Sequence, residues 1–373
     1  LGDVYKRQDI TLRDYAAADG DMTLEAGDNI YAHGELSTTN AGNITAAAGD
    51  NIHLYNTPTS ADADGSITLT ADADTDTVGD VDVEGDLLAD GDIDIYASNN
   101  TIYLGGDLVQ ASDNVTLHNK TIFDGSGNQR VDAVTGALTA LKNVEKTTSG
   151  NLNMGGDTGI YLAGRLVKTH AGNLTFEDAV TANRTSGNGN QKFNANAGGG
   201  KVLYAKSTIT KTTKGDLTLM GGRVGNDGSD DAHFEIDLDG DVTVLDGSLI
   251  LGLDGKDDDT TVTAGGKLQA SEDVIVKDTL NGEGALDVIA GDNITLHKDV
   301  TAAGDLLLKA DNDGDNTGDM TAMGNVISTG GSIDIFSADS TTHLYSDVTA
   351  AGHVWLHNNT EMHAAGKTIE SLW

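Results

Sequence analysis

A short phrase recurs along almost the whole chain, and it constrains the fold more than any other feature. The phrase is Gly, then Asp, Asn or Ser, then apolar residues that alternate with polar ones. It occurs at Gly20–Leu24, Gly42–Thr45, Gly65–Leu69, Gly91–Ile95, Gly215–Leu219, Gly291–Leu296 and Gly331–Ile335. Repetition of this kind is typical of solenoid architectures, in which each unit packs only against its neighbours.

Each phrase predicts a tight turn followed by a short strand. Gly adopts the positive φ that a sharp corner needs, and an Asp or Asn side chain bonds to its own backbone there. The residues that follow alternate with period two, so Ile93 and Ile95 share one face of a strand while Asp92 and Asp94 share the other. No stretch of helix length has a sustained apolar period of about 3.6 residues.

The spacing of the phrases predicts the next level of structure. Gly20, Gly42 and Gly65 follow one another at nearly equal intervals of roughly 20 residues. Slightly shorter intervals separate Gly247, Gly266, Gly284, Gly304 and Gly324. Connections this short cannot contain crossover helices, which excludes a doubly wound α/β sheet. An antiparallel meander fits short connections but does not require the longer period. We therefore expect an all-β parallel β-helix (β-solenoid) of about 20 residues per coil, with coils about 4.8 Å apart.

The chain divides into zones by regularity and charge. Residues 1–8 break the repeat and resemble translated adaptor sequence, so they are excluded from the fold prediction. Residues 9–125 and 215–373 carry the regular phrase, and the second stretch ends without a cap. Residues 126–214 are expected to form an irregular, cationic zone of the same β-helix, with a projecting loop near 181–200.

Charge excludes some partners. The chain has 59 acidic and 22 basic residues, a formal net charge of −37, which disfavours nucleic acid and anionic membranes. Eleven basic and five acidic residues give the 126–214 zone a net charge of +6. This zone is either drift among exposed positions or a band that binds an acidic ligand. On the second interpretation the candidate ligand-binding residues are Lys201, Lys206, Lys211 and Lys214.

Two segments of the repeat, Ala41–Ile52 and Ala290–Leu296, resemble the repeats of filamentous haemagglutinins. Those are large bacterial exoproteins of two-partner secretion, and related autotransporter passengers are similar. The resemblance covers nearly all of residues 9–370. It implies a right-handed parallel β-helix, export through an outer-membrane barrel, an extracellular or cell-surface location, and adhesion to glycans or proteins of host cells or neighbouring bacteria.

Acidic runs are the candidate metal sites. Asp311, Asp313, Asp315 and Asp319 offer alternate oxygen ligands, as a calcium loop does. The EF-hand pattern fails, because Gly is misplaced and no Glu closes the loop. Asp residues that follow Gly in successive coils are expected to stack about 4.8 Å apart, at a cost of roughly 1 kcal/mol per pair in water. Bound Ca²⁺ would relieve that repulsion.

Neither the positions of the histidines nor any nucleophile motif predicts a catalytic site. His118, His297 and His357 each follow a strand in separate coils, so they cannot share a metal. His353, His357 and His363 are closer in sequence, but no zinc site is assigned to them. Gly-x-Ser-x-Gly and His-Glu-x-x-His motifs are missing. We assign no catalytic residue and no cofactor other than the calcium hypothesis.

The leading functional hypothesis is a fragment of a secreted or surface-exposed bacterial adhesin, a structural rod that presents loops for attachment. Under this hypothesis the chain is not an enzyme. One alternative is a β-helical polysaccharide lyase or hydrolase, which would need a groove built by long loops with basic and aromatic residues. Another is a phage tail-fibre segment, which would trimerise. The sequence contains no apolar run of eighteen residues that would predict a transmembrane helix.

Overall fold

The computed structural model describes residues 8–55, 58–74, 78–195, 202–221, 234–252, 260–315, 317–337, 340–363 and 366–372. Within these residues the chain forms forty-seven short strands and no helix. It divides into two compact units, Leu1–Ala179 and Val180–Trp373. Accordingly, no described helix is long and apolar enough to cross a membrane.

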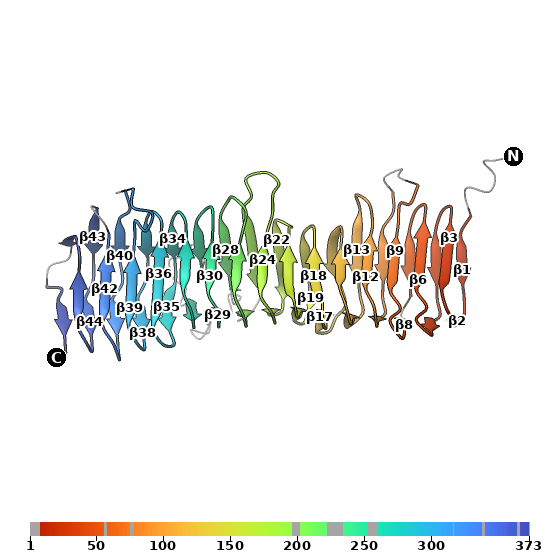
Figure 1. Cartoon of the computed structure of the whole chain (residues 1–373), viewed down its shortest axis with the longest axis horizontal. Coiled ribbons are helices and arrows are strands. Elements are labelled where there is room, and N and C mark those ends of the chain that lie inside the picture. The colour runs from red at the N-terminus through yellow and green to blue at the C-terminus, as the bar shows by residue number, and fades with distance from the viewer. Residues whose placement is uncertain are drawn as a thin grey trace, which may run out of the picture. The chain divides into compact units, whose positions relative to one another are not determined.

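Three parallel sheets build the first unit (Figure 1). The first contains β1 (Ile10–Leu12), β4 (Ile30–Ala32), β7 (Ile52–Leu54), β10 (Val81–Val83), β13 (Thr101–Leu104), β16 (Lys120–Phe123), β19 (Val144–Ser149) and β22 (Leu166–Ala171). The second contains β2 (Ala16–Asp19), β5 (Leu36–Thr39), β8 (Thr59–Ala61), β11 (Leu87–Ala89), β14 (Leu108–Ala111), β17 (Gln129–Ala133), β20 (Leu152–Gly156) and β23 (Leu174–Phe176). The third contains β3 (Met22–Ala26), β6 (Ile44–Ala48), β9 (Ile67–Thr70), β12 (Ile93–Tyr96), β15 (Val115–Leu117), β18 (Ala137–Ala140) and β21 (Gly159–Leu162).

The second unit repeats this arrangement. Its first sheet contains β25 (Gln191–Ala195), β28 (Leu217–Met220), β31 (Leu249–Leu251), β34 (Val274–Val276), β37 (Ile294–Leu296), β40 (Met320–Ala322), β43 (Thr341–Leu344) and β46 (Asn359–Met362). Its second contains β26 (Val202–Ala205), β29 (Phe234–Leu238), β32 (Thr260–Ala264), β35 (Thr279–Gly282), β38 (Val300–Ala302), β41 (Val326–Ser328), β44 (Val348–Ala350) and β47 (Ile369–Ser371). Its third contains β24 (Val180–Ala182), β27 (Ile209–Lys211), β30 (Val242–Val244), β33 (Leu268–Ala270), β36 (Leu286–Ala290), β39 (Leu306–Lys309), β42 (Ile333–Phe336) and β45 (Val354–Leu356).

Strands pair in parallel with the strand three places further along the chain, so three strands make one turn of a β-solenoid. Ile30 lies opposite Ile52, and Val274 lies opposite Ile294. Residues that face each other on successive turns are therefore separated by one repeat of the sequence phrase. The predicted all-β parallel β-solenoid, with about 20 residues per turn, is confirmed.

Apolar side chains fill the interior of the turns. Ile93 and Ile95 of β12 are fully buried, whereas Asp92 is exposed, as the alternation of the repeat phrase predicts. The register places Ile93 next to Ile67 of the preceding turn and Val115 of the following one, and both are fully buried as well. This interior row therefore stacks branched apolar side chains directly on one another, which is the packing that β-branched residues favour.

A buried lysine interrupts the apolar interior of the first unit. Lys146 of β19 is fully buried and pairs in register with Phe123 of β16. Its Nζ donates hydrogen bonds to the Gly125 carbonyl at 2.8 Å, to Gln129 Oε1 at 2.8 Å and to Thr148 Oγ1 at 3.1 Å. Burial lowers the pKa of Lys146, because the charged form loses its hydration. Part of the predicted cationic zone therefore faces inward and supports the fold.

The polar residue of the repeat phrase forms ladders that join successive turns. In the first unit, Asp21 Oδ1 accepts the backbone N–H of Asn43 at 2.9 Å, and Asn43 Oδ1 accepts that of Ser66 at 2.9 Å. Ser66 Oγ then accepts the N–H of Asp92, and Asp92 Oδ1 accepts that of Asn114. Each side chain thus binds the corner N–H of the next turn.

A ladder in the second unit has the same design. Its hydrogen bonds run from Asn190 through Asp216, Ser248, Asp273, Asn293 and Asp319 to the N–H of Thr341. In both ladders Asn, Ser or Thr occupies the turns next to each Asp. The expectation that carboxylates stack on successive turns is therefore wrong for these positions. Repulsion between the Asp carboxylates of these ladders gives no reason for calcium to bind there, because a neutral Asn or Ser side chain lies between one carboxylate and the next.

Asn293→Asp tests the alternation of charge in the second ladder. The change places a third carboxylate between Asp273 and Asp319 and removes the amide donor that reaches Asp273 Oδ1 at 2.9 Å. We expect a loss of about 1–3 kcal/mol in the free energy of unfolding, partly recovered in high salt. Denaturant titrations at two salt concentrations measure it. Asn293→Ser is the control, since Ser248 occupies an equivalent position; equal losses in both variants would contradict the charge argument.

Lys146→Ala tests the buried lysine. The change opens a cavity and leaves buried acceptors without their donor, so we expect the free energy of unfolding to fall by about 2–5 kcal/mol. Lys142→Ala removes an exposed lysine of the same zone and should change stability by no more than about 0.5 kcal/mol. Denaturant midpoints of the two variants give the comparison, and similar midpoints would show that Lys146 has no structural role.

Candidate functional site

The structure separates the four predicted calcium ligands. Asp313 and Asp315 lie in the connection between β39 and β40, and their carboxylates approach that of Asp292 to within 4.8 Å. Asp319 ends the same connection but is not part of this group, and its Oδ1 accepts the backbone N–H of Thr341 at 3.1 Å. Asp311 is buried and is not part of the converging group. The sequence thus identified two of the three carboxylates that converge, and it missed Asp292.

Burial and neighbouring charges act together on Asp292. Burial raises the pKa of Asp292, and the carboxylates of Asp273, Asp313, Asp315 and Asp311 raise it further. The group therefore consists of carboxylates that repel one another, and Asp313 and Asp315 are exposed to solvent. Their oxygen ligands suit a hard cation such as Ca²⁺ rather than a transition metal.

The four predicted ligand-binding lysines have different environments. Lys201 lies outside the described residues. Lys206 is exposed just after β26. Lys211, at the end of β27, is fully buried, and its Nζ donates to the Thr213 carbonyl at 2.8 Å and to Thr213 Oγ1 at 2.9 Å. Lys211 is therefore a structural residue rather than a surface ligand, which corrects the prediction for this position.

Lys214 lines a surface hollow of about 530 Å³ beside the loop of residues 183–190. The other lining residues are Arg184, Thr185, Gly187, Asn188, Gly189 and Thr213. The predicted projecting loop is shorter than expected, since residues 191–195 form strand β25. The hollow is cationic, because Arg184 and Lys214 line it. Burial lowers the pKa of the neighbouring Lys211, and the charge of Arg184 lowers it further.

Hydrogen bonds hold the 183–190 loop in a closed shape over the end of β27. Arg184 Nη1 donates to the Asn190 carbonyl at 3.0 Å, and Thr213 Oγ1 donates to the Arg184 carbonyl at 2.7 Å. Gly189 has φ +76°, and a Cβ there would lie 1.7 Å from the Lys214 carbonyl. The loop backbone therefore lies directly against Lys214, which fixes the wall of the hollow.

Several histidines pair with a carboxylate of a neighbouring turn. His118 Nε2 lies 2.7 Å from Asp94 Oδ1, and His357 Nε2 lies 2.6 Å from Asp334 Oδ1. His53 Nε2 lies 3.0 Å from Asp82 Oδ2 and 3.5 Å from Glu84 Oε1. Burial raises the pKa of Asp82, and the charge of His53 opposes that rise. His53 and Asp82 are direct register partners, whereas His118 and His357 each lie two residues beyond the register partner of their carboxylate.

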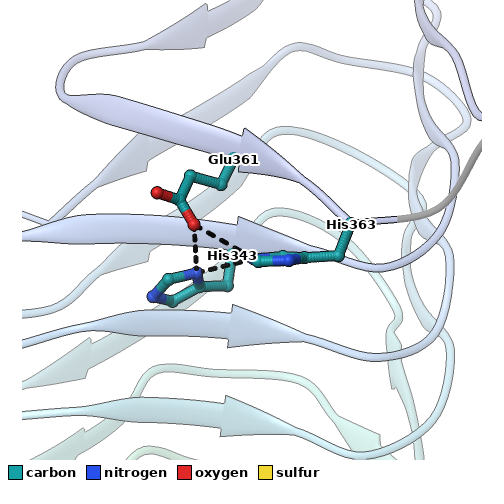
Figure 2. A group of neighbouring side chains, drawn as sticks. All are labelled: His343, Glu361 and His363. Carbon is teal, nitrogen blue, oxygen red and sulfur yellow. Dashed lines mark hydrogen bonds and ion pairs between the residues drawn. The ribbon is translucent and has the colours of Figure 1, made fainter.

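One cluster brings together two histidines and a glutamate (Figure 2). His343 lies on β43, Glu361 lies opposite it on β46, and His363 follows β46. His343 Nδ1 is 2.8 Å from His363 Nε2, and each of these nitrogens is 3.4 Å from Glu361 Oε2. Proximity in the sequence groups His363 with His353 and His357 instead. The missed signal is that one full turn of the repeat separates His343 from His363.

The pair of Glu145 and His170 predicts a pH dependence of stability. A hydrogen bond from His170 lowers the pKa of Glu145 below its ordinary value of 4.5, and burial opposes the shift. Ionised Glu145 therefore stabilises the folded chain above pH 4.5, and this contribution is lost as pH falls through the lowered, folded-state pKa. Denaturant unfolding of the wild type and Glu145→Gln at about pH 6 and about pH 3.5 measures it. The difference in the free energy of unfolding between the wild type and Glu145→Gln should be smaller at the lower pH. An equal difference at both pH values would contradict this prediction.

No protein-family model matches the chain, and neither the curated proteins nor the solved structures contain a significant match to it.

Proposed function

We propose that the chain is a segment of a secreted or surface-exposed bacterial adhesin, in which the β-solenoid is a scaffold and its loops make the attachments. The interior of the turns is filled with apolar side chains, and the corner side chains are used to bind the next turn. What remains for recognition is the outward face of the strands and the loops between them. Loops on a rigid scaffold carry binding function more often than the scaffold itself.

The cationic hollow at the 183–190 loop is the observation that carries this proposal. The chain has a net charge of −37, yet Arg184 and Lys214 line the same hollow. A guanidinium has five N–H donors in a planar fork, which suits a carboxylate or sulfate group. Arg184 makes its contacts with Asn188 and Asn190 through Nη1. The ligand that fits is an acidic saccharide of a surface glycan.

The charge of the whole chain limits the kind of acidic ligand. A long polyanion would experience the field of the many surrounding carboxylates, whereas a single acidic sugar in the hollow meets mainly Arg184 and Lys214. Asp216 lies at the edge of this region, where its Oδ2 accepts the side-chain amide of Asn190 at 2.9 Å. We therefore expect binding to depend on one or two acidic residues of a glycan and to weaken with added salt.

The double variant Arg184→Ala/Lys214→Ala tests the proposal. Binding of the full chain to immobilised acidic and neutral oligosaccharides is measured by biolayer interferometry at low and physiological salt. The wild type should prefer acidic glycans, and the double variant should lose at least about tenfold in affinity, because two charge-assisted contacts are removed. Lys206→Ala is the matched control, since Lys206 is an exposed lysine of the same unit outside the hollow.

Two outcomes would contradict the proposal: no acidic glycan binds the wild type, or the double variant binds as well as the wild type does. Incubation of the same oligosaccharides with the wild type, followed by mass spectrometry, separates an adhesin from a polysaccharide-active enzyme. An adhesin leaves the glycan intact, whereas a lyase or hydrolase releases shorter products.

A further inference from the structure

His343, Glu361 and His363 come from two adjacent turns of the second unit and point toward one another (Figure 2). Parallel pairing of β43 with β46 places His343 directly beside Glu361. His363 lies two residues after Glu361 and therefore projects from the same side of the turn. Three ligating side chains thus converge without any long loop, because the register of the solenoid aligns them.

The distances within this cluster match the coordination of a small divalent ion. His343 Nδ1, His363 Nε2 and Glu361 Oε2 are separated by 2.8, 3.4 and 3.4 Å. A tetrahedral Zn²⁺ with bonds of about 2.0–2.1 Å keeps its ligand atoms about 3.3 Å apart. Two of the three separations already have this value, and the third needs an opening of about 0.5 Å, which side-chain torsions provide.

We propose that His343, Glu361 and His363 form a binding site for a divalent transition metal of the Zn²⁺ class. Two imidazole nitrogens and one carboxylate oxygen are a ligand set that zinc uses in proteins with three protein ligands and one open position. Imidazole selects Zn²⁺, Cu²⁺, Ni²⁺ and Co²⁺ over Ca²⁺ and Mg²⁺. The chain contains no Cys, so imidazole supplies its strongest neutral ligands for these metals.

Packing around the cluster positions the two rings. Tyr345 stacks on His363 with ring centroids 4.5 Å apart and an interplanar angle of 13°. The side chains of His343 and His363 are 26% and 32% exposed, whereas that of Glu361 is 58% exposed. The imidazole side chains are therefore less exposed than the glutamate side chain.

The other side-chain clusters of the described residues lack this combination. The group of His53, Asp82 and Glu84 has a single imidazole, and the group of Asp292, Asp313 and Asp315 has none. His357 pairs with Asp334 and stacks on Phe336 at 3.8 Å, without a second histidine nitrogen in that pair. These clusters can be compared with the His343 cluster, because they lie on the same kind of turn but have fewer imidazole ligands.

The 2.8 Å separation of His343 Nδ1 and His363 Nε2 is that of a hydrogen bond between the two rings. A metal bound by both nitrogens would replace that hydrogen bond, because each nitrogen then directs its lone pair at the ion.

The test uses the full chain without a histidine tag and Co²⁺ as a spectroscopic probe. We expect one Co²⁺ per chain with the intense visible absorption of tetrahedral coordination, displaced by an equivalent of Zn²⁺ and unaffected by Ca²⁺ in excess. His343→Gln and His363→Gln should each weaken binding at least about tenfold, and the double variant should abolish the absorption. His357→Gln is the matched control and should bind like the wild type.

A second variant and a second readout protect the test against misfolding. Glu361→Gln keeps both imidazoles on the strand wall and should weaken binding less than either histidine change. Thermal melts in chelator establish that each variant folds, and added Zn²⁺ should raise the melting temperature of the wild type but not of the double variant. No saturable Co²⁺ binding by the wild type, or equal binding by the wild type and the double variant, would overturn the proposal.

Discussion

The hydrogen bond from each corner side chain to the next turn's backbone is the interaction on which the rest of the structure depends. A sharp corner leaves backbone N–H groups outside the strand ladders, and a buried or half-buried N–H without a partner is costly. Asp, Asn and Ser at the second position of the repeat phrase accept those N–H groups from the following turn. The phrase therefore specifies both the bend and the contact between turns.

Fixing the corners also fixes the register of every strand. A slip of one residue would turn each strand over, exposing Ile93 and Ile95 and burying Asp94. The same register decides which outward side chains meet. It places His343 beside Glu361 of the next turn. The same turn also brings His363 into contact with His343. The candidate metal site is thus a product of turn length as much as of residue type.

Much of the fold could be predicted from the sequence, because the signal is local and repeated. Gly marks each corner, period two marks each strand, and the longer spacing excludes helices between strands. The buried lysines could not be predicted, since Lys146 and Lys211 occupy positions where the repeat has apolar residues. Only the folded structure shows that Gln129 and Thr213 provide their partners. Charge alone had placed Lys211 among surface ligands.

The candidate sites were predictable only in part, for a related reason. Sequence proximity suggested that Asp311 to Asp319 would act together, whereas the ladder takes Asp319 away and Asp292, from the preceding turn, joins Asp313 and Asp315. Proximity also grouped His363 with His353 and His357. In a solenoid residues one full repeat apart are also neighbours, so a site combines residues from successive turns that are far apart in the sequence.

The ladders have a direction, and this decides what each corner depends on. In each rung the side chain of the earlier turn is the acceptor, and the N–H of the later turn is the donor. The backbone N–H of a corner therefore takes its partner from the turn before it, whatever side chain the corner itself carries. A substitution at the second position of the phrase consequently acts first on the following turn, because the N–H of that turn is the group that loses its acceptor.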